Sequence, residues 1–146
     1  MKNTMTEAAL DFSEEDVQKM LDNLDTFSQE EVVEIGNHHR ILADMLMGIE
    51  RGEKDRICVN IPPRHGKSQL VSIYFPAWFL GRNPNKKVMM VSHTTDLAVD
   101  FGRKVRNLIS TEEYKQIFPT VSLASDSKSA GRWNTNIGGE YYACGI

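Results

Sequence analysis

The sequence predicts an α/β fold in which helices alternate with the strands of a mainly parallel sheet. Two short apolar runs, residues 57–61 (ICVNI) and 88–91 (VMMV), have the length and composition of buried strands. A segment with helical periodicity follows each run, over residues 68–80 and residues 95–108. The order strand, helix, strand, helix favours parallel pairing, because a crossover helix returns the chain to the same end of the sheet.

Length and composition are those of one globular domain. The 146 residues are 40% hydrophobic and 25% charged. There is no run of about 18 apolar residues and no basic-then-apolar N-terminus, so we expect no membrane span, no secretory signal and a cytoplasmic location. Cys58 and Cys144 lie far apart, without the close spacing of a metal site, and we expect both to be reduced. The adjacent His38 and His39 point to different sides of a helix and do not predict a metal site either.

Charge divides the chain into two parts. Residues 1–35 hold ten acidic and two basic side chains, a charge of −8, whereas residues 36–146 are mildly basic at +5. Ser13 and the capping box formed by Ser28 and Glu31 predict helices in and after the acidic segment. We expect this segment to pack as a structural helix, although a partner-binding arm is the alternative. A further apolar stripe at helical spacing runs to Ile49 and is closed by Gly52.

The last third of the chain carries weaker signals. We expect a cap at Thr94 or Thr95 before the helix that presents Leu97, Phe101, Val105 and Leu108 on one face. A helical turn over residues 114–118 would stop at Pro119. Residues 132–135 and 140–144 flank the turn sequence NIGG and predict a β-hairpin.

The segment PPRHGKS, residues 62–68, carries the strongest functional signal. It stands between a predicted strand and a predicted helix, where backbone N–H groups can converge on a phosphate. Gly66 permits close backbone approach, Lys67 supplies a point charge for the terminal phosphates, and Ser68 offers a hydroxyl ligand to Mg²⁺. The pattern predicts a P-loop that binds ATP, or a close relative, together with Mg²⁺.

The loop departs from the standard pattern at Ile61, where a glycine is expected. Pro62 and Pro63 have no N–H to donate, so the amides of residues 64–68 must form the phosphate cradle. Arg64 is either a stabiliser of γ-phosphate charge or an arginine paired elsewhere, and the sequence favours neither. His65 is either a loop-shaping residue or a phosphate donor. The candidate nucleotide-binding residues are Arg64, His65, Gly66, Lys67, Ser68 and Gln69, and the candidate catalytic residues are Lys67 and Arg64.

Residues 56–68 resemble the strand and variant Walker A loop of the large terminase subunits of tailed phages, the ATP-driven motors that package DNA into capsids. The resemblance continues in the same order through residues 75–82, 92–98, 101–106, 129–133 and 138–142. With the helix before the first strand it covers residues 36–146, which is more specific than the loop alone.

The resemblance implies a three-layer P-loop ATPase domain over residues 36–146, preceded by the acidic helical segment 1–35. It implies double-stranded DNA, a small terminase subunit and a portal protein as partners of a homo-oligomeric ring. The location would be the cytoplasm of the bacterial host and the portal vertex of the capsid. The family continues with a Walker B strand and a nuclease domain beyond the point that matches Ile146. We therefore expect this chain to be the N-terminal part of such an ATPase, incomplete at its C-terminus, which binds nucleotide weakly without turnover.

Several side chains have two possible roles. The carboxylates of Asp96, Asp100, Glu112 and Glu113 are better explained as solvated helix residues than as a Walker B acid. The cluster of Arg103, Lys104 and Arg106 would contact DNA or a neighbouring subunit, or else form a solvated face, which we favour slightly. Trp133, Tyr141 and Tyr142 would stack on bases or, more often for a hairpin, pack in a core. Two other functions remain open, another translocase or helicase-like P-loop ATPase and a non-catalytic fragment that binds a partner.

Overall fold

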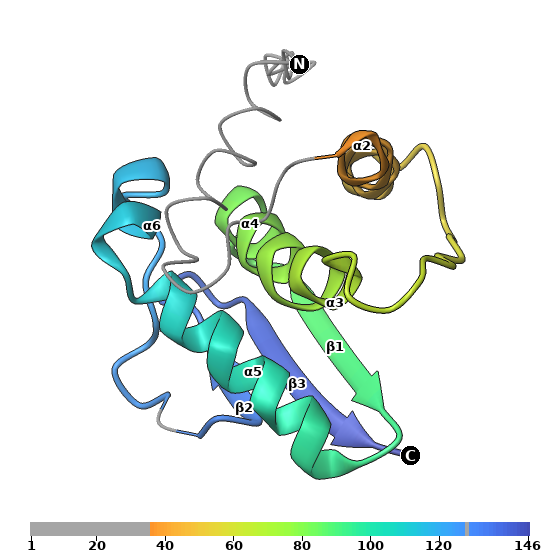
Figure 1. The fold of residues 1–146 in the computed structure, drawn as a ribbon. Coiled ribbons are helices and arrows are strands. Elements are labelled where there is room, and N and C mark those ends of the chain that lie inside the picture. Colours follow the sequence, from red (N-terminus) through yellow and green to blue (C-terminus); the bar gives the residue numbers. More distant parts are fainter. Residues whose placement is uncertain (1–35, 128) are drawn as a thin grey trace, which may run out of the picture. The chain divides into compact units, whose positions relative to one another are not determined.

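The computed structural model describes residues 36–127 and 129–146 (Figure 1). The chain divides into two compact units, residues 1–44 and residues 45–146, and the boundary falls inside helix α2 (Asn37–Glu50). Helix α2 lies within the helical stripe expected up to Ile49. The helix cap at Ser13 and the capping box at Ser28 lie outside the described residues.

The second unit alternates helices and strands. Helices α3 (Lys67–Gln69), η1 (Leu70–Tyr74) and α4 (Phe75–Arg82) follow one another without a break. Strand β1 (Lys87–Ser92), helix α5 (Thr95–Ile109) and helix α6 (Glu112–Ile117) come next. Strands β2 (Arg132–Asn134) and β3 (Glu140–Gly145) complete the order.

The sheet has three strands in the order β1-β3-β2 (Figure 1). Strand β1 pairs with β3 in parallel, from Lys87 opposite Glu140 to Ser92 opposite Gly145. Strands β2 and β3 pair antiparallel, which confirms the predicted hairpin. The sheet of the described residues is therefore mixed, with one parallel and one antiparallel pairing, where a mainly parallel sheet was expected.

The prediction of a strand over residues 57–61 is wrong for this structure. These residues form no strand, and Cys58 is exposed. A run of apolar, β-branched residues suits a strand, but a strand forms only where a neighbour supplies the backbone hydrogen bonds. The segment leads into the loop as extended chain outside the sheet, with Ile57, Val59 and Ile61 partly buried.

Helix α5 packs on one face of the sheet and forms the core with it. Thr94 caps this helix, and its Oγ1 accepts a hydrogen bond from the Leu97 amide at 3.3 Å. The predicted face is confirmed at Val105, which is fully buried, and at Phe101 and Leu108, which pack against the core, whereas Leu97 is 37% exposed. Ala98, Gly102 and Ile109 on the same helix are also buried. The small residues at 98 and 102 allow the helix to approach the sheet closely. The core also includes Ile73, Ala77, Leu80, Tyr114, Val121, Trp133, Tyr141 and Ala143.

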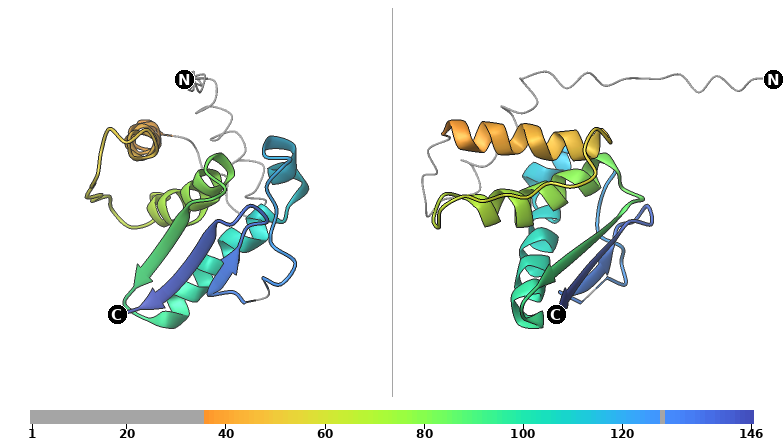
Figure 2. Two further views of the ribbon diagram at one scale, coloured as in Figure 1. Left: turned by 180° about the vertical axis from the view of Figure 1, so that it is seen from behind. Right: turned by 90° about the vertical axis from the view of Figure 1, so that its right-hand side faces the viewer.

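The other face of the sheet is exposed among the described residues of this unit. Figure 2 shows α5 and the α3–α4 helix on the same side of the strands. Met89, Val91 and Tyr142 are 67%, 45% and 40% exposed. Strand β1 is thus half-buried and not buried on both faces, as its composition had suggested.

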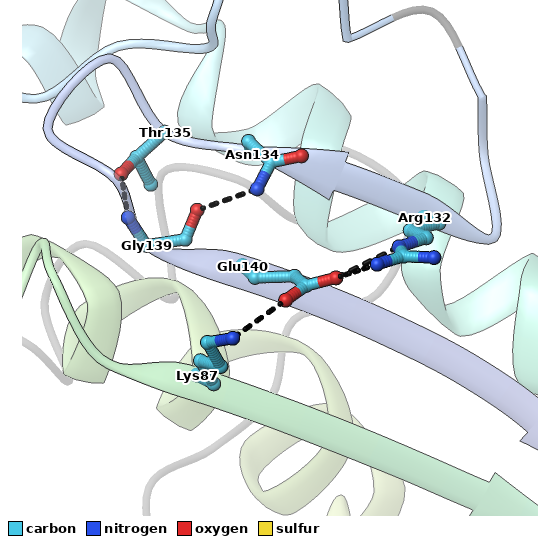
Figure 3. A network of polar contacts seen from close by, with 6 residues as sticks. All are labelled: Lys87, Arg132, Asn134, Thr135, Gly139 and Glu140. Carbon is cyan, nitrogen blue, oxygen red and sulfur yellow. Dashed lines mark hydrogen bonds and ion pairs between the residues drawn. The ribbon is translucent and has the colours of Figure 1, made fainter.

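An ion network crosses the exposed face of the sheet (Figure 3). Glu140 on β3 pairs with Lys87 of β1 at 3.2 Å and with Arg132 of β2 at 2.7 Å. The side-chain hydrogen bonds from Lys87 and Arg132 hold the pKa of the Glu140 carboxyl below its usual value. This network joins all three strands at the end of the sheet where β1 and β3 begin.

The helix after the loop contains a π-helical turn at residues 70–74, directly before Pro76. Pro76 has no N–H for the bond to the preceding turn, and a proline inside a helix often kinks it. Here the wider turn precedes the proline, which stands in the first turn of α4, where its missing N–H costs least.

A candidate phosphate-binding loop

Residues 62–66 form a turn that leads directly into the helix starting at Lys67. Gly66 is the residue before the helix, and its carbonyl oxygen accepts the Leu70 amide at 2.9 Å. The first amides of a helix have no partner within it, so those of residues 67–69 are oriented toward whatever lies before the helix. Because Gly66 has no side chain, it cannot cap these amides.

Two residues of the loop have positive φ. Arg64 has a φ of 64°, and among the described residues no other non-glycine residue has a positive φ. Gly66 has a φ of 72°, and His65 between them does not share the sign. Alternation of left-handed and right-handed residues turns successive N–H groups into one concavity, which is the geometry of anion-binding nests. The left-handed conformation costs Arg64 about 1–2 kcal/mol, whereas Gly66 adopts it freely.

His65 contacts the backbone of its own loop. Its Nδ1 lies 2.8 Å from the carbonyl oxygen of Pro63. A carbonyl oxygen only accepts, so Nδ1 carries the hydrogen and donates it. The ring thus forms a bond across Arg64, the residue with the unusual φ.

The candidate site residues differ in exposure. Arg64, His65, Ser68 and Gln69 are exposed, while Gly66 and Lys67 are partly buried. The Ser68 hydroxyl and phosphate oxygens are ligands of the kind that Mg²⁺ prefers. The part of the chain described here contains no group of three or more His, Cys, Asp or Glu side chains that could hold a metal ion.

The four carboxylates considered for catalysis lie on helices. Asp96 is in the first turn of α5, and Glu112 and Glu113 are in the first turn of α6. Asp100 pairs with Lys104 at 3.0 Å and with Arg103 at 3.5 Å, and the Lys104 hydrogen bond lowers the pKa of its carboxyl. Glu112 pairs with Lys115 at 2.7 Å. None of the four lies at the carboxyl end of β1 or β3.

Solvent exposure distinguishes the basic residues of α5 from two of the three aromatic residues of the hairpin. Arg103 and Lys104 are exposed on α5 beside their partner Asp100, as on a solvated helix face. Trp133 and Tyr141 are fully buried, so they pack in the core and cannot stack on a base. Tyr142 is 40% exposed and has the Arg132 guanidinium 5.7 Å from its ring centroid.

Comparison of the chain with protein-family models, with curated proteins and with solved structures gave no match. Within the residues described, no helix has both the length and the apolar character needed to cross a membrane. Sequence reasoning missed the left-handed conformation of Arg64, because arginine carries no signal for it, and left the role of His65 open.

Proposed function

We propose that residues 62–69 bind the phosphates of ATP together with Mg²⁺. In this proposal Lys67 lies beside the β- and γ-phosphates, Ser68 is a magnesium ligand, and the amides from Arg64 to Ser68 form the cradle. The observation that carries it is the pair of left-handed residues, Arg64 and Gly66, immediately before the start of the α3–α4 helix. A concavity of amides, a helix N-terminus and a lysine in its first turn together favour a bound polyphosphate.

The wider proposal is that the chain is the N-terminal part of the ATPase of a phage DNA-packaging motor of the large terminase type. Its support is the ordered resemblance over residues 36–146, together with the parallel pairing of β1 and β3, which α/β ATPases require. Such a motor would act as a ring of copies on double-stranded DNA, with a small terminase subunit and a portal protein. It would work in the host cytoplasm and at the portal vertex of the capsid.

We expect the 146-residue chain to bind nucleotide without hydrolysing it. Hydrolysis needs an acid that orders the magnesium shell and a group that orients the attacking water. The carboxylates weighed for this role lie on α5 and α6, and two of them, Asp100 and Glu112, pair with lysines. Turnover of ATP by the purified chain that is lost in Lys67→Ala would contradict this expectation.

Isothermal titration calorimetry of the chain with MgATP tests the binding proposal. We expect saturable binding that weakens at least about tenfold in Lys67→Ala, because the phosphates lose a charged donor. Lys115→Ala is the matched control, since Lys115 is exposed and its ammonium pairs with Glu112 on its own helix. Ser68→Ala should weaken MgATP binding more than binding of ATP in the presence of a chelator. If the folded wild-type chain shows no binding, the proposal is wrong and a non-catalytic, partner-binding role gains support.

A further inference from the structure

The bond between His65 and Pro63 fixes one side of the candidate loop. The Nδ1 atom of His65 donates to the Pro63 carbonyl oxygen at 2.8 Å. A neutral imidazole carries one hydrogen, so this contact selects the Nδ1–H tautomer. Free histidine in water favours the opposite tautomer, with the hydrogen on Nε2. The loop geometry therefore assigns His65 a chemical state that can be measured.

The bond spans a single residue, and that residue is the strained one. Arg64 lies between Pro63 and His65 with a φ of 64°. Arginine does not favour this region, so a contact between its two neighbours has to help hold it there. Pro63 contributes a fixed φ and cannot donate an N–H, which leaves its carbonyl as the fixed acceptor.

We propose that His65 is a positioning residue that holds Arg64 in the left-handed conformation and so orients the loop amides for phosphate. The proposal rests on the proposed function of the loop. Without the Nδ1–H bond, Arg64 relaxes to ordinary dihedral angles and the alternation with Gly66 is lost. Binding of a polyphosphate then has to restore the concavity, and its affinity falls by the cost of that reorganisation.

The bond serves the loop and not the stability of the core. His65 and Arg64 are both exposed, and neither belongs to the hydrophobic core cluster. Loss of a bond between exposed groups changes the free energy of unfolding little. Effects on nucleotide affinity and on folding should therefore separate in variants of His65.

Two substitutions of His65 distinguish the contribution of Nδ1 from that of Nε2. His65→Asn keeps an N–H donor near the place of Nδ1, whereas His65→Gln moves the amide to the place of Nε2. We expect MgATP affinity within about twofold of wild type for His65→Asn and about fivefold to tenfold weaker for His65→Gln. Both variants should unfold at the same urea concentration as the wild type, and equal affinities of the two variants would overturn the proposal.

Nitrogen-15 NMR of the full chain in mildly alkaline buffer gives a second readout that does not depend on nucleotide. We expect the His65 signal, assigned by its loss in His65→Gln, to show the Nδ1–H tautomer. An Nε2–H tautomer would overturn the positioning role while leaving the proposed function intact. Absence of MgATP binding in the wild type as well as in Lys67→Ala would overturn both. Wild-type binding with unchanged affinity in His65→Gln would overturn the positioning role alone.

Discussion

The rings of Trp133 and Tyr141 stack face to face, 3° from parallel, with their centroids 4.9 Å apart. They are opposite each other in the β2–β3 hairpin, and both are fully buried. Both also meet Gly102 of α5. The Trp133 Nε1–H donates to the Gly102 carbonyl oxygen at 3.2 Å, and a Cβ at Gly102 would lie 3.0 Å from Cε1 of Tyr141. Helix α5 therefore contacts both rings of the hairpin at a residue without a side chain.

The first prediction concerns that contact. Gly102→Ala should lower the free energy of unfolding by about 1–3 kcal/mol, because the new methyl would overpack the core. It would lie 2.6 Å from the Ala130 carbonyl oxygen as well as close to Tyr141. Helix propensity alone predicts the opposite sign, a gain of roughly 1 kcal/mol for alanine over glycine. Urea unfolding followed by circular dichroism measures the change.

Asn107→Ala is a suitable control for this variant, since Asn107 is exposed on the same helix. It should be neutral or slightly stabilising, as alanine is the better helix former. A stabilised Gly102→Ala variant would mean that α5 does not approach the sheet as closely as the structure has it.

The second prediction compares two buried tyrosine hydroxyls. The Tyr114 hydroxyl donates to the Ala77 carbonyl oxygen at 2.9 Å, whereas that of Tyr141 has no hydrogen-bond partner among residues 36–127 and 129–146. Tyr114→Phe should cost about 1 kcal/mol of stability at neutral pH. Tyr141→Phe should be neutral or stabilising by up to about 1 kcal/mol, because it removes a buried polar group that gains nothing from burial. Equal losses in both variants would contradict this difference.

The third prediction is the response of the same tyrosines to alkali. Burial raises the pKa of Tyr141 to about 12 from 10.0 and also raises the pKa of Tyr114. Above about pH 10 the unfolded chain releases these protons and the folded chain keeps them, so stability falls as pH rises. For Tyr141 the loss reaches about 2 kcal/mol by pH 12. Unfolding free energies measured from neutral to alkaline pH should fall less steeply in Tyr141→Phe, and parallel curves would contradict the burial of its hydroxyl.

Local signals in the sequence predicted elements whose hydrogen bonds are made by near neighbours. The hairpin β2–β3, the cap at Thr94 and the helix after the loop follow from turn residues, capping chemistry and 3.6-residue periodicity. The strand expected over residues 57–61 failed because a strand depends on a neighbour that local composition does not specify. On α5 the predicted burial of Val105 is confirmed, but apolar periodicity did not indicate that the small residues Ala98 and Gly102 are also buried.

The candidate loop was located from sequence, but its conformation was not. The pattern of Gly66, Lys67 and Ser68 before an apolar helix placed the loop at a helix N-terminus, where the structure also has it. The residue types do not indicate the positive φ of Arg64 or the contact of His65 with Pro63. Both arise from the way a turn closes on itself, which depends on dihedral angles and not on composition.

The fourth prediction concerns the link between the hairpin and the start of β1. Thr135 Oγ1 donates to the Pro84 carbonyl oxygen at 2.6 Å and accepts the Gly139 amide at 2.8 Å, and Thr135 is 2% exposed. Figure 3 shows the second of these bonds closing the hairpin turn. Thr135→Val keeps the shape but leaves both backbone groups without this partner, so it should cost about 2–3 kcal/mol. Thr135→Ser keeps the hydroxyl and should cost about 1 kcal/mol for the lost methyl group. A Thr135→Ser variant as unstable as Thr135→Val would show that the methyl group contributes more to stability than the two hydrogen bonds.

The last prediction decides between the two roles of Arg64. Arg64→Asn removes the positive charge, yet asparagine tolerates the left-handed conformation that Arg64 has at a φ of 64°. The loop should therefore keep its shape, with stability unchanged or raised by up to about 1 kcal/mol, because asparagine relieves strain at this exposed position.

If the guanidinium reaches the γ-phosphate, Arg64→Asn should weaken MgATP binding about tenfold and leave MgADP binding within about twofold, because only ATP carries that group. Calorimetric titration with both nucleotides gives the ratio. An equal weakening for ATP and ADP would place the side chain on the shared phosphates. Unchanged affinities for both nucleotides would mean that Arg64 serves the loop through its backbone alone, since its charge would then contribute nothing to the bound state.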